Sequence, residues 1–333
     1  MLSAWRDGWR RVLAAPAVIA GVFAATLLTA LPLALTMRGL IETHLGRSLM
    51  ADTAAEGVNY DWWQEFLSQA SGLGTTLTPS VIGFAATLDN ISSVMDAQRE
   101  IVPVTAALAT YLLIWTFLSG GVIDRYARQR PTRTHGFFAA AGVFFWRFAR
   151  LGVLAGLVYW FLFAYVHSWL FTDLYSRMTR DLAVERAAFA WRAGLYAMFG
   201  ALLVAASVVF DYARIRIVVE DRRSAIGSLL AALSFIARRP GRVLGLYALN
   251  GLVFLVVIAA WAVVAPGAGG AGLSIWLGFG VSQVYVVGRL IVKLQFLASE
   301  TALFQASLAH ARYTAAPEPV WPESPAAETI RPV

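Results

Sequence analysis

The chain has 333 residues, of which 59% are hydrophobic and 14% are charged. A soluble domain has about 45–50% apolar and about 25% charged residues, so this composition excludes an ordinary soluble protein and indicates an integral membrane protein. The net charge of +7 therefore indicates how the basic residues are distributed across a membrane, and it is not taken as a sign of nucleic-acid binding. The absence of cysteine excludes disulfides, thiolate metal sites and cysteine nucleophiles.

Six apolar segments have the length that a membrane-crossing helix requires, or come close to it. In chain order they are 16–36, 101–123, 151–171, 193–210, 243–265 and 272 to about 297. The first follows a basic N-terminus, as a signal peptide would, but it is longer than the apolar part of a usual signal peptide. We therefore expect an uncleaved first span. The predicted fold is an all-α polytopic membrane protein with six transmembrane helices, comprising residues 1–312.

Between the first two spans lies an insertion, residues 38–100. Its stretch NYDWWQEFLSQA places apolar residues on one face of a helix. Such a helix would either lie on the outer leaflet with its tryptophans at the headgroups or pack over the ends of the spans. The apolar segment 80–88 is too short to cross a membrane and is expected to be an interfacial or buried outer helix. At the other end of the chain, residues 313–333 are rich in Pro, Ala and Glu and are predicted to be disordered.

The arginines are distributed unevenly along the chain. They are concentrated near residues 6–11, 125–150 and 214–242, whereas 38–100 holds three arginines and eight acidic residues. Because basic residues of membrane proteins gather on the cytoplasmic side, this asymmetry predicts that both termini are cytoplasmic. The loop 172–192, which carries four arginines on the outer side, departs from the rule. The strong preference for arginine, with Lys293 the only lysine, is associated with a bacterial genome and hence with a bacterial cytoplasmic membrane.

An internal repeat is visible at the ends of the second and fourth spans. SGGVIDRYARQR begins at Ser119 and SVVFDYARIRIV begins at Ser207, and their aspartates lie 87 residues apart, at 124 and 211. Aromatic and basic segments then precede the next span in both cases, and a similar segment precedes the first span. The chain is therefore predicted to contain three two-helix repeats, each introduced by an interfacial amphipathic helix.

The aspartates at 124 and 211 form the most specific candidate site. A carboxylate near the hydrocarbon is costly unless it is paired, and the sixth span ends with two bases four residues apart on one helix face. The predicted cluster of charges comprises Asp124, Asp211, Arg289 and Lys293. The alternative is that both aspartates lie in water and pair with neighbouring arginines.

A second set of candidate residues is basic and faces the inner leaflet. The segments 137–150 and 228–239 are aromatic and basic, which favours interfacial helices that contact anionic headgroups. The predicted contacts are Arg125, Arg128, Arg147, Arg150, Arg214, Arg216, Arg238 and Arg239. Membrane lipids are thus the expected partners, together with a possible membrane protein; nucleic acid is not expected.

The residues Phe117-Leu-Ser-Gly-Gly121, a basic loop, an aromatic interfacial segment and DYARIR together resemble a loose group of bacterial multi-pass proteins. The group includes the membrane domain fused to some glycerophosphodiester phosphodiesterases, and its stand-alone relatives. The resemblance covers most of residues 1–312 and implies a six-helix membrane domain. The fused catalytic domain has no counterpart in these 333 residues, so its activity and catalytic residues do not carry over.

The sequence contains none of the common catalytic or cofactor motifs. The four histidines lie in no metal-binding spacing, and no phosphate-binding loop or nucleophile elbow occurs. The sequence therefore predicts a non-enzymatic protein without cofactors that acts as a scaffold, accessory subunit or lipid-contacting module. The alternative is a permease or exporter of a small or lipid-like solute, with Gln283, Asn250 and the exit charges along its path.

Overall fold

The computed structural model describes residues 1–57, 59–78, 80, 83–267 and 273–309, and every regular element in these ranges is helical. Six helical segments are long and apolar enough to cross a membrane, which confirms the predicted all-α polytopic fold. They are α2 (Pro16–Leu45), α6 (Val102–Arg128), the continuous segment Thr134–Thr179 that begins with α7 (Thr134–Phe161), α9 (Glu185–Val219), α11 (Pro240–Val264) and α12 (Leu273–Ala309).

Shorter helices connect these segments. They are α1 (Leu2–Leu13), α3 (Ala51–Glu56), α4 (Tyr60–Gln69), η1 (Gly72–Thr76), α5 (Ala85–Met95), α8 (Tyr175–Thr179) and α10 (Ala225–Arg238), with two π-helical turns, η3 (Leu162–His167) and η4 (Trp169–Leu174), between α7 and α8. The predicted tail, residues 313–333, and part of the predicted segment 80–88 lie outside the described residues.

The predicted interfacial helix at 137–150 is not a separate element. α7 runs without a break from this segment into the third span, whereas α1 and α10 are separate short helices that precede α2 and α11. Proline explains the difference. Pro16 and Pro240 stand at the first positions of α2 and α11, where they favour a new helix and cannot continue the previous one. No proline stands between residues 132 and 239, so nothing forces a break between 150 and 151.

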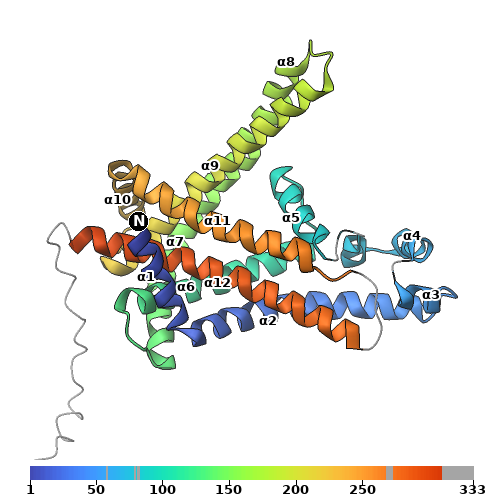
Figure 1. Cartoon of the computed structure of the whole chain (residues 1–333), viewed down its shortest axis with the longest axis horizontal. Coiled ribbons are helices and arrows are strands. Elements are labelled where there is room, and N and C mark those ends of the chain that lie inside the picture. Colours follow the sequence, from blue (N-terminus) through green and yellow to red (C-terminus); the bar gives the residue numbers. More distant parts are fainter. Residues whose placement is uncertain (58, 79, 81–82, 268–272, 310–333) are drawn as a thin grey trace, which may run out of the picture.

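Close packing is concentrated at one end of the bundle. We call this the basal end; it holds the N-terminus, the α6–α7 and α9–α10 connections and the last turns of α12 (Figure 1). Its fully buried side chains include Ile123, Tyr126, Tyr212, Ile215, Leu246, Leu294 and Phe304. Helix α1 packs against α12 so closely that a Cβ on Gly8 would lie 2.8 Å from the Cα of Ser299. Glycine is therefore required at that contact.

At the opposite, distal end the helices diverge. The hairpin of α8 and α9 points away from the ends of α2, α11 and α12 (Figure 1). Met95 and Asp96, at the end of α5, contact this hairpin, because the Met95 carbonyl lies 2.9 Å from Nε2 of His167 and Tyr196 donates to Asp96. The Tyr196 bond holds the pKa of the Asp96 carboxyl below its ordinary value.

Helix α4 packs on the distal end of α2. Trp62 Nε1 donates to Nδ1 of His44 at 3.1 Å, Trp63 Nε1 donates to the Leu77 carbonyl at 2.6 Å, and Phe66 is buried. Both indole groups therefore bond to protein. Of the two interpretations of this helix, the contacts favour packing over the ends of the spans.

Candidate functional site

A cavity of about 810 Å³ lies among five of the six spans. Its volume falls within the roughly 300–1,000 Å³ that is typical of small-molecule sites. The lining residues are Thr26, Thr29, Ala30 and Leu33 of α2; Val104, Ala107, Leu108, Tyr111 and Trp115 of α6; Ser207, Asp211 and Arg214 of α9; Tyr247 and Phe254 of α11; and Val286, Arg289, Leu290, Val292, Lys293, Phe296 and Leu297 of α12.

The cavity has a charged end and an apolar end. Helix α9 runs toward the basal end, so Asp211 and Arg214 follow Ser207 in that direction, and α12 places Arg289 and Lys293 beyond Val286. The more distal lining residues are instead Leu33, Val104, Ala107, Leu108 and Phe254. The charges therefore lie toward the basal end and the apolar side chains toward the distal end.

The depth of the charges follows from helix geometry. Arg289 lies 16 residues along α12 from Leu273, which is about 24 Å at about 1.5 Å per residue. The hydrocarbon core of a bilayer is about 30 Å thick, so the charged end falls near one boundary of the hydrocarbon. Asp211, Arg214 and Lys293 are half-buried there, whereas Arg289 is exposed. Charges inside spans usually face a bundle interior or a water-filled space, and these four line the cavity between the spans.

Lys293 is held by aromatic rings of α6. Its Nζ donates to the hydroxyl of Tyr111 at 2.9 Å and lies 3.6 Å from the centroid of the Trp115 ring. Tyr111 and Trp115 are four residues apart and hence share a face of α6. The negative faces of the rings attract the ammonium group and partly replace its hydration.

The other cations of the charged end are arranged differently. Asp211 pairs with Arg214, three residues further along α9, at 3.1 Å, and its charge also attracts Lys293. The guanidinium of Arg289 lies 5.5 Å from the centroid of the Tyr285 ring. In the part of the chain that the structure describes, no carboxylate lies within ion-pair distance of Arg289 or Lys293.

The structure thus brings together three of the four residues of the predicted cluster. Asp124 lies elsewhere and pairs with Arg128 in its own helix, at 2.9 Å. At 3.6 residues per turn, Asp124 is rotated by about 140° around α6 from Tyr111, which lines the cavity. The carboxylate therefore faces away from Arg289 and Lys293. It pairs with a neighbouring arginine, as the alternative interpretation expected, but it is buried and does not lie in water.

Two of the arginines predicted to contact lipid are used inside the protein instead. Arg125 is buried and donates to the Ala14 carbonyl at 3.1 Å. Arg216 donates to Glu220 and to the Ala231 carbonyl, and its guanidinium lies over the ring of Phe304. These two predictions are corrected, because the side chains connect helices at the basal end.

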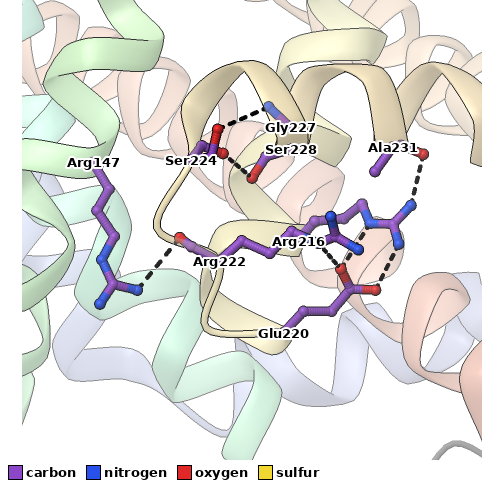
Figure 2. A network of polar contacts seen from close by, with 8 residues as sticks. All are labelled: Arg147, Arg216, Glu220, Arg222, Ser224, Gly227, Ser228 and Ala231. Carbon is purple, nitrogen blue, oxygen red and sulfur yellow. Dashed lines mark hydrogen bonds and ion pairs between the residues drawn. The ribbon is translucent and has the colours of Figure 1, made fainter.

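The stretch that contains Arg216 forms the α9–α10 junction (Figure 2). Glu220 accepts from Arg216 at 2.7 Å and also from Arg222. Ser224 then begins α10 by accepting from the backbone N–H of Gly227, the usual role of a serine at a helix N-terminus. Burial opposes ionisation of Glu220, but the two arginines outweigh it and lower the pKa of its carboxyl.

Of the remaining predicted lipid contacts, Arg147 and Arg214 are also directed into the protein, and Arg128 and Arg150 make polar contacts within their own helices. Arg147 donates to Asp221 and to the Arg222 carbonyl, which connects α7 to the same junction (Figure 2). Arg214 lines the cavity. The others, Arg128, Arg150, Arg238 and Arg239, lie at the basal surface, where Arg128, Arg150 and Arg238 are exposed and Arg239 is half-buried. These four are placed where a headgroup could reach them.

Sequence reasoning missed the aromatic side of the cavity. Tyr111, Trp115 and Tyr247 were treated as ordinary residues of spans, although the spacing of Tyr111 and Trp115 was a usable signal. Asn250, which the transport hypothesis placed on a path, bonds instead to the hydroxyl of Ser299 at 2.8 Å and is buried. Gln283 does not belong to the lining of the cavity.

Comparisons with known proteins add no relative to this picture. No family model, curated protein or solved structure matches the chain. The resemblance drawn from the sequence therefore remains a prediction, and the function is argued from the cavity and its charges alone.

Proposed function

We propose that the protein is a non-enzymatic, lipid-contacting module of a bacterial cytoplasmic membrane that holds a lipid-like molecule between its spans. The observation that carries this proposal is the cavity, because its charged end and its apolar end match the two parts of an amphiphile. Most of its lining is apolar, and a few polar groups converge at one end, as is usual in sites for small ligands.

The proposal includes an orientation, in which the basal end is cytoplasmic. The arginine-rich connections at that end support it, since such residues are retained on the cytoplasmic side. Cysteine substitutions test it directly, because the protein has no cysteine of its own. A Ser71→Cys variant in intact cells should react with an impermeant reagent added outside, and a Thr132→Cys variant should not. The reverse pattern would contradict the orientation.

The proposed function is tested by filling the cavity. Ala107 lines the apolar end on α6, whereas Ala109 lies on the same helix, is exposed, and is not part of the lining. Native mass spectrometry from a mild detergent should show a lipid-like molecule retained by the original protein and by Ala109→Trp, and lost from Ala107→Trp. Equal retention by both variants would show that the bound molecule lies outside the cavity.

A permease or exporter of a lipid-like solute is the second candidate. The position of the cavity among α2, α6, α9, α11 and α12 favours it, because the substrate sites of transporters lie between spans. Movement of a labelled amphiphile between the leaflets of reconstituted vesicles separates the candidates. A rate that increases with the amount of protein, and that Ala107→Trp abolishes, would support transport over retention.

A further inference from the structure

The charges of the cavity specify the kind of molecule that fits it. Among the described residues that line it, three are basic, Arg214, Arg289 and Lys293, and one is acidic, Asp211. Provided that the proposed function holds and the cavity takes an amphiphile, we propose that this amphiphile carries an anionic headgroup, a phosphate or a carboxylate, bound by Arg289 and Lys293.

Arg289 and Lys293 are the cations available to an anion. Arg214 is engaged by the carboxylate of Asp211, so that pair has no net charge. Arg289 and Lys293 are approached by aromatic rings and by the hydroxyl of Tyr111, none of which carries a negative charge. Asp211 attracts Lys293 but pairs with Arg214 and lies beyond ion-pair distance of Lys293. Two cations near the hydrocarbon without a carboxylate partner are costly, and an anion between them would remove much of that cost.

The two side chains are suited to one anion. They are four residues apart, so they project from the same face of α12 into the same cavity. A guanidinium offers a planar fork that matches two oxygens of a phosphate or carboxylate, and an ammonium adds a point charge with rotatable donors. The hydroxyls of Tyr111 and Tyr247 line the same region and are further possible donors.

The remainder of the ligand is identified by the opposite end of the cavity. Leu33, Val104, Leu108 and Phe254 offer no hydrogen-bonding side chain, so burial of an apolar chain is what this end favours. A free inorganic anion would use the charged end alone. An anionic amphiphile would use both ends, with the headgroup basal and the chain distal.

Binding of three probes to the protein in a neutral detergent tests the inference. Dodecyl phosphate combines a chain with a net negative headgroup, dodecylphosphocholine has the same chain with no net charge, and inorganic phosphate has no chain. We expect dodecyl phosphate to bind at least about tenfold more tightly than either of the others. Arg289→Gln and Lys293→Gln should each weaken it about tenfold, the loss expected for one hydrogen bond to a charged group.

Two control variants accompany the measurement. Arg38→Gln removes an exposed cation that pairs with Glu42 at the distal end of α2, and binding should not change. Arg289→Lys keeps the charge, and should retain most of the affinity that Arg289→Gln loses. If Arg289→Gln fails to fold, the comparison of Arg289→Lys with Lys293→Gln still tests the assignment.

The outcomes distinguish the inference from the proposed function. If the two dodecyl probes bind equally and neither glutamine variant matters, the anionic assignment is wrong while the cavity still holds an amphiphile. If inorganic phosphate binds as tightly as dodecyl phosphate, the ligand is a soluble anion and the lipid-like part is overturned. If no probe binds and Ala107→Trp behaves as the original protein, the proposed function itself fails.

Discussion

The basal and distal ends of the same helices differ in how they are packed. In α6, all of the residues 119–126 near the basal end are buried, whereas none of the residues 102–114 nearer the distal end is buried. At the basal end α1, α10 and the ends of the spans form one continuous core, and polar side chains join the connections between helices. Toward the distal end the hairpin of α8 and α9 diverges from the other spans (Figure 1), and α2, α6, α9, α11 and α12 line the partly open cavity.

This difference indicates that the two ends of the same helices have different roles. The basal end fixes the positions of the six spans, so the helical segments that line the cavity need not pack tightly against one another. The distal hairpin has a small core of its own, formed by Leu162, Leu170, Leu195 and Phe199. A cavity for a ligand can then exist without unfolding the protein, because the basal core supplies the stability. The charged end of the cavity lies where these two regions meet, and Asp211 and Lys293 extend from helices that the basal core holds in place.

The largest expected effect is at the basal end of α11. Leu246→Ala should lower the free energy of unfolding by about 2–5 kcal/mol, because it leaves a space in a close-packed core. Leu255→Ala, a control on the opposite, exposed face of the same helix, should stay within about 0.5 kcal/mol, as exposed positions do. Thermal unfolding in detergent measures both. Similar losses for the two variants would mean that Leu246 does not lie in a close-packed basal core.

The next effect concerns the α9–α10 junction. Glu220 is 5% exposed and accepts from Arg216, which is 14% exposed, and from Arg222, which is 40% exposed. Glu220→Gln leaves the largely buried Arg216 without its carboxylate and should cost about 3 kcal/mol. Glu42→Gln removes an exposed pair, with Glu42 60% exposed, and should cost at most about 1 kcal/mol. A cost no greater than that of Glu42→Gln would show that the junction does not stabilise the basal end.

The same residue predicts a dependence on pH. Because the folded protein lowers the pKa of Glu220 below its ordinary 4.5, ionised Glu220 stabilises the fold above that pH. This contribution should be lost as the pH falls below 4.5 and through the lowered pKa. Melting temperature measured from pH 7 down to pH 3 should therefore fall less steeply for Glu220→Gln than for the original protein. Parallel curves would exclude the contribution.

The smallest effect on stability is expected at the charged end of the cavity. Asp211 is 19% exposed and Arg214 is 29% exposed, so Asp211→Asn should cost between about 1 and about 3 kcal/mol, the values typical of exposed and buried pairs. It should also tighten binding of dodecyl phosphate, because it removes the only acid among the described lining residues. Asp124→Asn is the control, since Asp124 lies outside the lining, and it should leave binding unchanged. Weaker binding by Asp211→Asn would argue against an anionic ligand.

Much of the fold was predictable because it depends on quantities that a sequence states directly. A run of about 20 apolar residues marks each span, and Pro16 and Pro240 mark where α2 and α11 begin. The continuity of α7 was predicted wrongly, because aromatic and basic composition suggested a separate interfacial helix. The absence of proline near residue 150 was the better signal.

The positions of the charged residues along the membrane normal were predictable, but which side chains face the cavity was not. Asp211, Arg289 and Lys293 end neighbouring spans at similar depth, so their proximity followed from the topology. Which way Asp124 points depends on the rotation of α6 about its axis, and packing fixes that rotation rather than a local pattern. The rotation of α6 also decides whether Tyr111 faces the cavity. Without it, Tyr111 was treated as a core residue, because an aromatic residue in a span is more often part of a core than beside a ligand.

A structure of the protein in lipid nanodiscs that contain an anionic lipid is the most direct test of the central claim, that the cavity holds an amphiphile with its headgroup at the charged end. We predict an elongated density among α2, α6, α9, α11 and α12, with its head beside Arg289 and Lys293 and its tail toward Leu108. A cavity closed by side chains, or a head density at the apolar end, would contradict the account.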